Sequence, residues 1–135
     1  MTFKDRDIKR LTDEWLRHKK IILAVDYDDT IFPFKHATKK ECLEVIEIVK
    51  WAQEVGAYIM IHTASPKSRH EEITDYCLNH GLVIDSINKN PIADLMYGNE
   101  GKPYYNWQLD DRSGLYYGLD ILIEAGIAVR ETNEI

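Results

Sequence analysis

Three aspartates and a threonine follow directly after an apolar run, and their spacing indicates metal-dependent chemistry. The apolar residues 21–25 are followed by Asp26, Asp28, Asp29 and Thr30. Carboxylates so close together repel one another unless protons or a cation offset their charge. Carboxylate oxygens are also the ligands that hard divalent cations take in proteins. We therefore expect a divalent-metal site directly after this run.

Two further segments bring polar side chains to the ends of predicted strands. Thr63 follows the apolar run 57–61, and the paired acids Asp110 and Asp111 follow the segment 104–109. In open α/β sheets, ligands bind outside the carboxyl ends of the strands. The three segments are therefore expected to place their polar residues at one edge of a parallel sheet.

The elements that must position these residues alternate between strand and helix. Strands are expected at 21–26, 57–61, 82–84 and 104–109, and helices at about 5–18, 38–56, 65–81 and 115–125. This alternation predicts an α/β protein with βαβ units, a central parallel sheet and a three-layer, Rossmann-like arrangement. The helix at 5–18 is an addition that packs on the sheet or contacts a second copy in a homo-oligomer.

Several helix ends carry local signals. Thr38 followed by Glu41 forms a capping box, and Gly56 is expected to end that helix. Ser65 with the following proline suits the start of the next helix. Gly126 is expected to close the helix around 115–125, which leaves room for a short last strand in the tail.

The composition is that of an ordinary globular protein. The chain has 135 residues, 44% of them hydrophobic and 30% charged, so we expect one domain spanning residues 1–135. The net charge of −6 argues against broad nucleic-acid binding.

No run approaches the roughly 20 apolar residues of a membrane span, and the charged first residues lack a signal core. A cytoplasmic location and reduced thiols at Cys42 and Cys77 are expected.

The order of these motifs resembles that of the haloacid dehalogenase (HAD) superfamily of phosphohydrolases. Its first motif is an apolar strand followed by D-x-D-x-T, here residues 26–30, and its second is a strand ending in Thr or Ser, here Thr63. Its third is a lysine, here Lys102, and its fourth is a strand ending in paired acids, here Asp110 and Asp111. The resemblance covers about residues 20–125.

The resemblance implies a Mg²⁺-dependent phosphomonoester hydrolase that works through an aspartyl-phosphate. Asp26 would be the nucleophile, and Asp28 would protonate the leaving oxygen and then activate water. Thr63 would bind a phosphoryl oxygen, and Lys102 would neutralise charge on the transferring group.

The resemblance also implies the metal ligands. Mg²⁺ would be held by Asp26, by the backbone carbonyl of Asp28 and by a fourth-motif acid. Asp110 is favoured as that acid, with Asp111 nearby or acting through water.

The sequence departs from the family pattern at two places. The family often has glycine after its second motif-one aspartate, whereas Asp29 stands there and adds negative charge. The third-motif lysine is ambiguous, because Lys89 is a rival to Lys102.

The gaps between motifs leave no room for a large cap domain. A capless site suits a large substrate or is closed by a neighbouring subunit, and Phe32, Phe34 and His36 lie where they could contact substrate. A phosphorylated small molecule and a phosphorylated polymer end both remain open as substrates.

Three other functions compete with the phosphohydrolase. A receiver-type phospho-acceptor domain also pairs acids after its first strand, but it needs a central acceptor aspartate where this chain has Thr63. A metal-dependent nuclease would use clustered acids, although the negative net charge weighs against it. A catalytically inactive interaction domain is the third alternative, since Asp29 could perturb the site.

Overall fold

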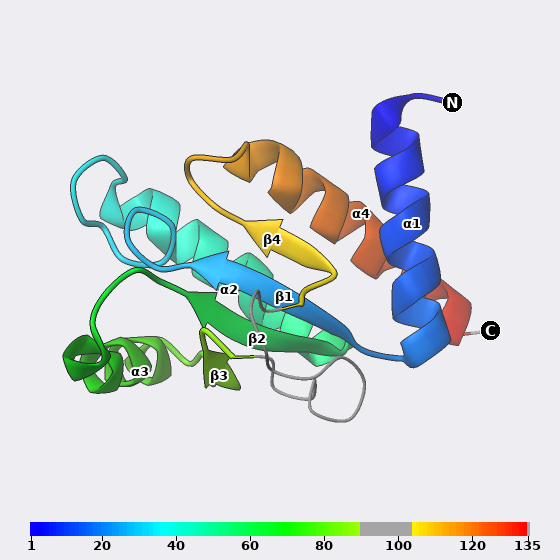
Figure 1. The fold of residues 1–135 in the computed structure, drawn as a ribbon. Helices are drawn as coiled ribbons and strands as arrows, with labels where there is room; N and C mark the ends of the chain where they lie inside the picture. The colour runs from blue at the N-terminus through cyan, green and yellow to red at the C-terminus, as the bar shows by residue number, and fades with distance from the viewer. Residues whose placement is uncertain (90–103, 135) are drawn as a thin grey trace.

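The computed structural model describes residues 1–89 and 104–134, which form an α/β protein around one parallel sheet (Figure 1). The strands are β1 (Ile21–Asp26), β2 (Ala57–His62), β3 (Ser86–Ile87) and β4 (Trp107–Leu109). The helices are α1 (Phe3–His18), α2 (Lys39–Val55), the 3-10 turn η1 (Lys67–Arg69), α3 (His70–Asn79) and α4 (Leu115–Asn133).

The sheet has the order β3-β2-β1-β4, and all its pairs are parallel. The carboxyl ends of β1, β2 and β4 therefore lie at one edge, as the matching directions of their arrows show in Figure 1. The predicted α/β class and central parallel sheet are confirmed. Within the described residues no large cap domain is inserted.

The sheet owes its stability to strands that are apolar on both faces. Residues 21–25 of β1 are all buried, and Leu23 and Val25 have no exposed surface. Their side chains join the main core with residues of α1, α2, α3 and α4, while Ile22, Ala24 and Met60 form a smaller cluster. Burying one such side chain contributes about 1.5–3 kcal/mol.

Helix α2 begins and ends where the sequence indicates. The hydroxyl of Thr38 accepts the N–H of Glu41 at 3.1 Å, and the Glu41 carboxylate accepts the N–H of Thr38 at 2.8 Å, which completes the predicted capping box. Gly56 follows the helix with φ of +122°, and a Cβ there would lie 2.9 Å from the carbonyl oxygen of Lys19. Glycine is required at this turn because any larger residue would collide with that backbone.

Two strands start later than the sequence predicts, because side chains take the place of the first backbone partners. The expected strand at 82–84 is wrong: the Asp85 carboxylate accepts the N–H of Ile59 at 2.7 Å, and β3 starts only after it. Likewise the amide oxygen of Asn106 accepts the N–H of Ile22 at 2.7 Å, so β4 starts at Trp107 rather than at 104.

The expected helix end at Gly126 is also wrong. Helix α4 continues through Gly126 to Asn133, so there is no strand among the described residues of the tail. A Cβ at Gly126 would lie 2.5 Å from the ring of Trp51. The glycine therefore lets α4 and α2 approach closely instead of ending the helix.

Helix α1 packs mainly on α4. It starts with a capping box between Thr2 and Asp5, and its Leu11 and Trp15 are buried. Figure 1 shows α1 beside α4, away from the carboxyl edge of the sheet. No helix among the described residues has both the length and the apolar character needed to cross a membrane.

Candidate metal and phosphate site

Three carboxylates from two neighbouring strands meet at the carboxyl edge of the sheet. Asp26 ends β1, and Asp110 and Asp111 follow β4, which pairs with β1. One carboxylate oxygen from each of the three lies within 4.8 Å of the others. The structure thus brings together the acids that the sequence assigned to the first and fourth motifs.

Burial and the neighbouring acids change the acidity of Asp26. The pKa of Asp26 is raised to about 7, first by burial and then by the carboxylates of Asp111 and Asp110. The hydroxyl of Thr30, 3.4 Å from the Asp26 carboxylate, opposes this rise in pKa only weakly. The three oxygens are hard donors that repel one another, so the residues fit a divalent cation.

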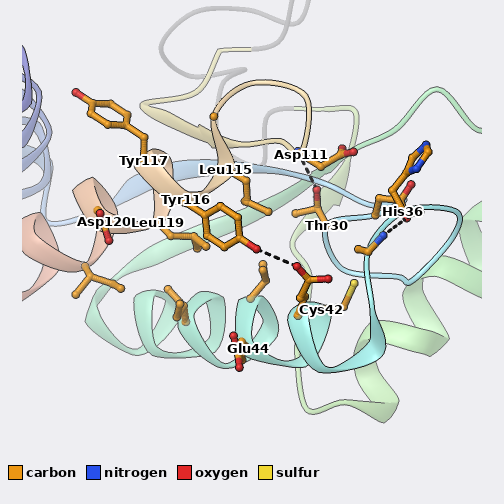
Figure 2. Close-up of a pocket in the computed structure, with 17 residues that line it drawn as sticks. Thr30, His36, Cys42, Glu44, Asp111, Leu115, Tyr116, Tyr117, Leu119 and Asp120 are labelled. Carbon is orange, nitrogen blue, oxygen red and sulfur yellow. Dashed lines mark hydrogen bonds between the residues drawn. The ribbon is translucent and has the colours of Figure 1, made fainter.

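Thr30 also connects the two loops that carry the acids. Its hydroxyl accepts the backbone N–H of Asp111 at 3.2 Å (Figure 2), and Thr30 itself is buried. The loop after β4 is therefore held against the loop after β1 at the level of the carboxylates.

The carboxylate of Asp28 points to a different partner. Its two oxygens accept hydrogen bonds from the guanidinium group of Arg69, at 2.9 and 3.0 Å. The carboxylate therefore does not belong to the three-acid cluster, and the expectation that the backbone carbonyl of Asp28 binds metal remains a prediction.

Asp29 holds the loop that follows the first motif. One of its carboxylate oxygens accepts four backbone N–H groups, those of Phe34 (3.1 Å), Lys35 (2.8 Å), His36 (2.9 Å) and Ala37 (3.1 Å). Burial opposes its ionisation, yet these four donors outweigh burial and lower the pKa of Asp29 to about 2.

The backbone at Asp29 has the conformation that glycine usually supplies, with φ of +62°. The carboxylate of Asp29 therefore binds the backbone of residues 34–37 and is not one of the three acids of the cluster. An aspartate at this position has a strained backbone conformation, and its carboxylate holds residues 34–37 in place through hydrogen bonds.

Thr63 lies after β2, which pairs with β1 in the register Asp26 to His62. Its hydroxyl accepts the N–H of Ser65 at 3.1 Å, which leaves the hydroxyl hydrogen to be donated. Asn88 fixes the Thr63 backbone, accepting its N–H at 2.9 Å and donating to its carbonyl at 2.8 Å.

The expected helix start at Ser65 is wrong. The chain first forms the short turn η1, with Pro66 preceding it, and α3 starts at His70. Thr63 is therefore placed by Asn88 and the Ser65 turn rather than by the first turn of an α-helix.

The two candidates for the third-motif lysine are Lys102 and Lys89. Lys102 lies outside the described residues. Lys89 is exposed, and its backbone carbonyl accepts a hydrogen bond from the hydroxyl of Ser86. Both lysines therefore remain candidates.

A cavity of about 570 Å³ adjoins the acid cluster, between α2 and the start of α4 (Figure 2). Thr30 and Asp111 form part of its wall, and the hydroxyl of Tyr116 donates across it to Glu41 at 2.9 Å. The other walls are largely apolar side chains of the two helices.

Comparison with known proteins leaves the family open. No family model matches the chain, and no curated protein matches it. A solved structure of a conserved protein from Bacteroides thetaiotaomicron is similar, with 21% identity and a TM-score of 0.58. The match covers 70% of this chain and 78% of the other. The likeness shows a shared fold. It carries no information about activity.

Arg69 is the residue of this site that the sequence analysis missed. It lies 41 positions from Asp28 and belongs to no short motif. The one available signal for Arg69 was its place shortly after the second-motif threonine. Many surface arginines lie at such places without any role in a site.

Proposed function

We propose that this protein is a Mg²⁺-dependent phosphomonoester hydrolase of the HAD type. The observation that carries the proposal is the meeting of Asp26, Asp110 and Asp111 at the edge where Thr63 also lies. The order of these residues along the chain supports the same conclusion, because it resembles the four family motifs.

The chemistry assigned to the residues is the one that the resemblance to the family implies. The Asp26 carboxylate would attack phosphorus and break the bond to the leaving oxygen, giving an aspartyl-phosphate. Asp28 would give a proton to that oxygen and later take one from the attacking water. Thr63 would donate its hydroxyl hydrogen to a phosphoryl oxygen.

The metal would be held by the carboxylates of Asp26 and Asp110, with Asp111 adjacent. A bound Mg²⁺ offsets the repulsion between the acids and the incoming phosphate. Substrates are phosphorylated small molecules or phosphorylated polymer ends, since the site has no large cap among the described residues to exclude a bulky group.

Phosphate release from an aryl phosphate, with and without Mg²⁺, tests this proposal. We expect Mg²⁺-dependent release that is lost in Asp26→Asn. Asp13→Asn is the matched control, because Asp13 makes an exposed ion pair with Lys9 on α1. Both variants should unfold cooperatively, and Asp13→Asn should melt like the wild type.

The proposal fails if no phosphoester is hydrolysed by the folded protein, or if Asp26→Asn and wild type release phosphate equally. Incubation with DNA and RNA in Mn²⁺ separates the nuclease alternative. Internal strand cleavage would favour a nuclease, and loss of terminal phosphate alone would favour the phosphatase.

A further inference from the structure

Arg69 forms the most complete polar contact near the acid cluster. Two of its N–H groups bind the two oxygens of Asp28, and it also donates to the hydroxyl of Ser65 at 2.8 Å. Its side chain is 21% exposed and that of Asp28 is 31% exposed, so both groups reach solvent at the site.

Three aromatic rings support the guanidinium group of Arg69. Its central carbon lies 5.2 Å from the ring centre of Tyr27, 5.8 Å from that of Phe32 and 5.9 Å from that of Phe34. The faces of such rings attract a cation. The arginine is therefore held in place while its N–H groups remain directed at an acceptor.

We propose that Arg69 binds the phosphoryl group of the substrate and that Asp28 occupies its N–H groups in the free protein. The inference rests on the phosphohydrolase function proposed above. A guanidinium group binds a carboxylate and a phosphate through the same pair of parallel hydrogen bonds, so one can replace the other.

The charges at the site favour this exchange. A phosphomonoester brings negative charge to an edge that already carries Asp26, Asp110 and Asp111. In residues 1–89 and 104–134, Arg69 is the one lysine or arginine in an ion pair with an acid of the first or fourth motif. Exchange of Asp28 for phosphate at a fixed guanidinium group would also release both oxygens of Asp28 for proton transfer.

Calorimetric titration with inorganic phosphate in the presence of Mg²⁺ tests the inference without turnover. We expect Arg69→Gln to weaken phosphate binding about tenfold or more, and Arg69→Lys to weaken it less because the charge remains. Arg10→Gln is the matched control, since Arg10 pairs with Glu14 on α1 and should bind phosphate like the wild type. Equal phosphate affinity in wild type and a folded Arg69→Gln would overturn the inference.

Asp28→Asn separates phosphate binding from a purely structural role and remains informative if Arg69→Gln does not fold. Because Asp28 competes with phosphate for Arg69, this variant should bind phosphate more tightly than the wild type. This gain in phosphate affinity should disappear in the Arg69→Gln background. If Arg69→Gln does not fold, the gain should shrink in the Arg69→Lys background. An equal gain with and without the intact arginine would overturn the inference.

Kinetics distinguish this inference from the proposed function. Phosphate release with the same KM in wild type and Arg69→Gln would overturn the role of Arg69 and leave the phosphatase standing. Arg69-dependent phosphate binding by a protein that hydrolyses no phosphoester would support Arg69 as an anion-binding residue and overturn the phosphatase.

Discussion

The backbone N–H of Asp111 donates a hydrogen bond to the hydroxyl of Thr30 at 3.2 Å, and this contact joins the first acidic loop to the second. The same hydroxyl lies 3.4 Å from the carboxylate of Asp26. One buried threonine therefore links the Asp26 carboxylate to the loop that carries Asp111.

Replacing Thr30 by valine tests this connection. Valine keeps the shape but removes the acceptor of the partly buried N–H of Asp111, which should lower the free energy of unfolding by about 1 kcal/mol. It should also weaken Mg²⁺ binding, because the acids are no longer held together. Urea unfolding and Mg²⁺ calorimetry measure the two effects. Thr30→Ser retains the hydroxyl and should lie close to wild type in Mg²⁺ affinity.

Variants of Asp29 separate its backbone conformation from its carboxylate. Asp29→Gly relieves the positive φ but removes the acceptor of four N–H groups, so we expect a net loss of about 2 kcal/mol in unfolding free energy. Asp29→Asn keeps one acceptor oxygen and should lose less. Hydrogen exchange at residues 34–37 should accelerate most in Asp29→Gly. A stabilised Asp29→Gly would show that backbone strain dominates.

Acid stability should depend on the same residue. The folded-state pKa of Asp29, about 2, lies below the ordinary value of 3.8. The folded state therefore binds fewer protons than the unfolded state between these values. The stabilisation by Asp29, complete above about pH 5, is lost as pH falls towards 2. Urea unfolding over this range should show a steeper decline for wild type than for Asp29→Asn. Parallel curves would contradict the assignment.

The acid cluster predicts the opposite pH trend. The pKa of Asp26 is raised from 3.8 to about 7, so without metal the folded state binds the extra proton and loses stability as pH rises through this window. A cation competes with that proton, so Mg²⁺ should raise the melting temperature more at about pH 8 than at about pH 5. Asp26→Asn should reduce the difference. Identical Mg²⁺ shifts at both pH values would argue against a metal at this cluster.

The contact between Gly126 and Trp51 predicts a packing defect. Alanine is the better helix former by about 1 kcal/mol, but its Cβ would lie 2.5 Å from the Trp51 ring. We expect Gly126→Ala to be destabilising by about 1–3 kcal/mol, since the helices must move apart. In a Trp51→Leu background the same change should cost less. Additive effects in urea unfolding would show that the two residues do not interact.

The residues that carry local signals were predictable from the sequence. The apolar run 21–25 is buried as a strand, Thr38 and Glu41 form their capping box, and the acids after the two strands meet as the parallel sheet requires. Each of these features depends on neighbours in the chain or on the common direction of parallel strands, so spacing alone specifies it.

Other features were decided by contacts between residues far apart in the sequence. Arg69 meets Asp28 across 41 positions, Gly126 makes room for Trp51, and Asp85 takes the N–H that a longer β3 would have used. Nothing in the local pattern distinguishes a helix-ending glycine from one that faces a neighbouring ring, or a surface arginine from one that binds a carboxylate. The sequence determined the sheet and its acidic edge, and the tertiary packing decided the partner of each charge.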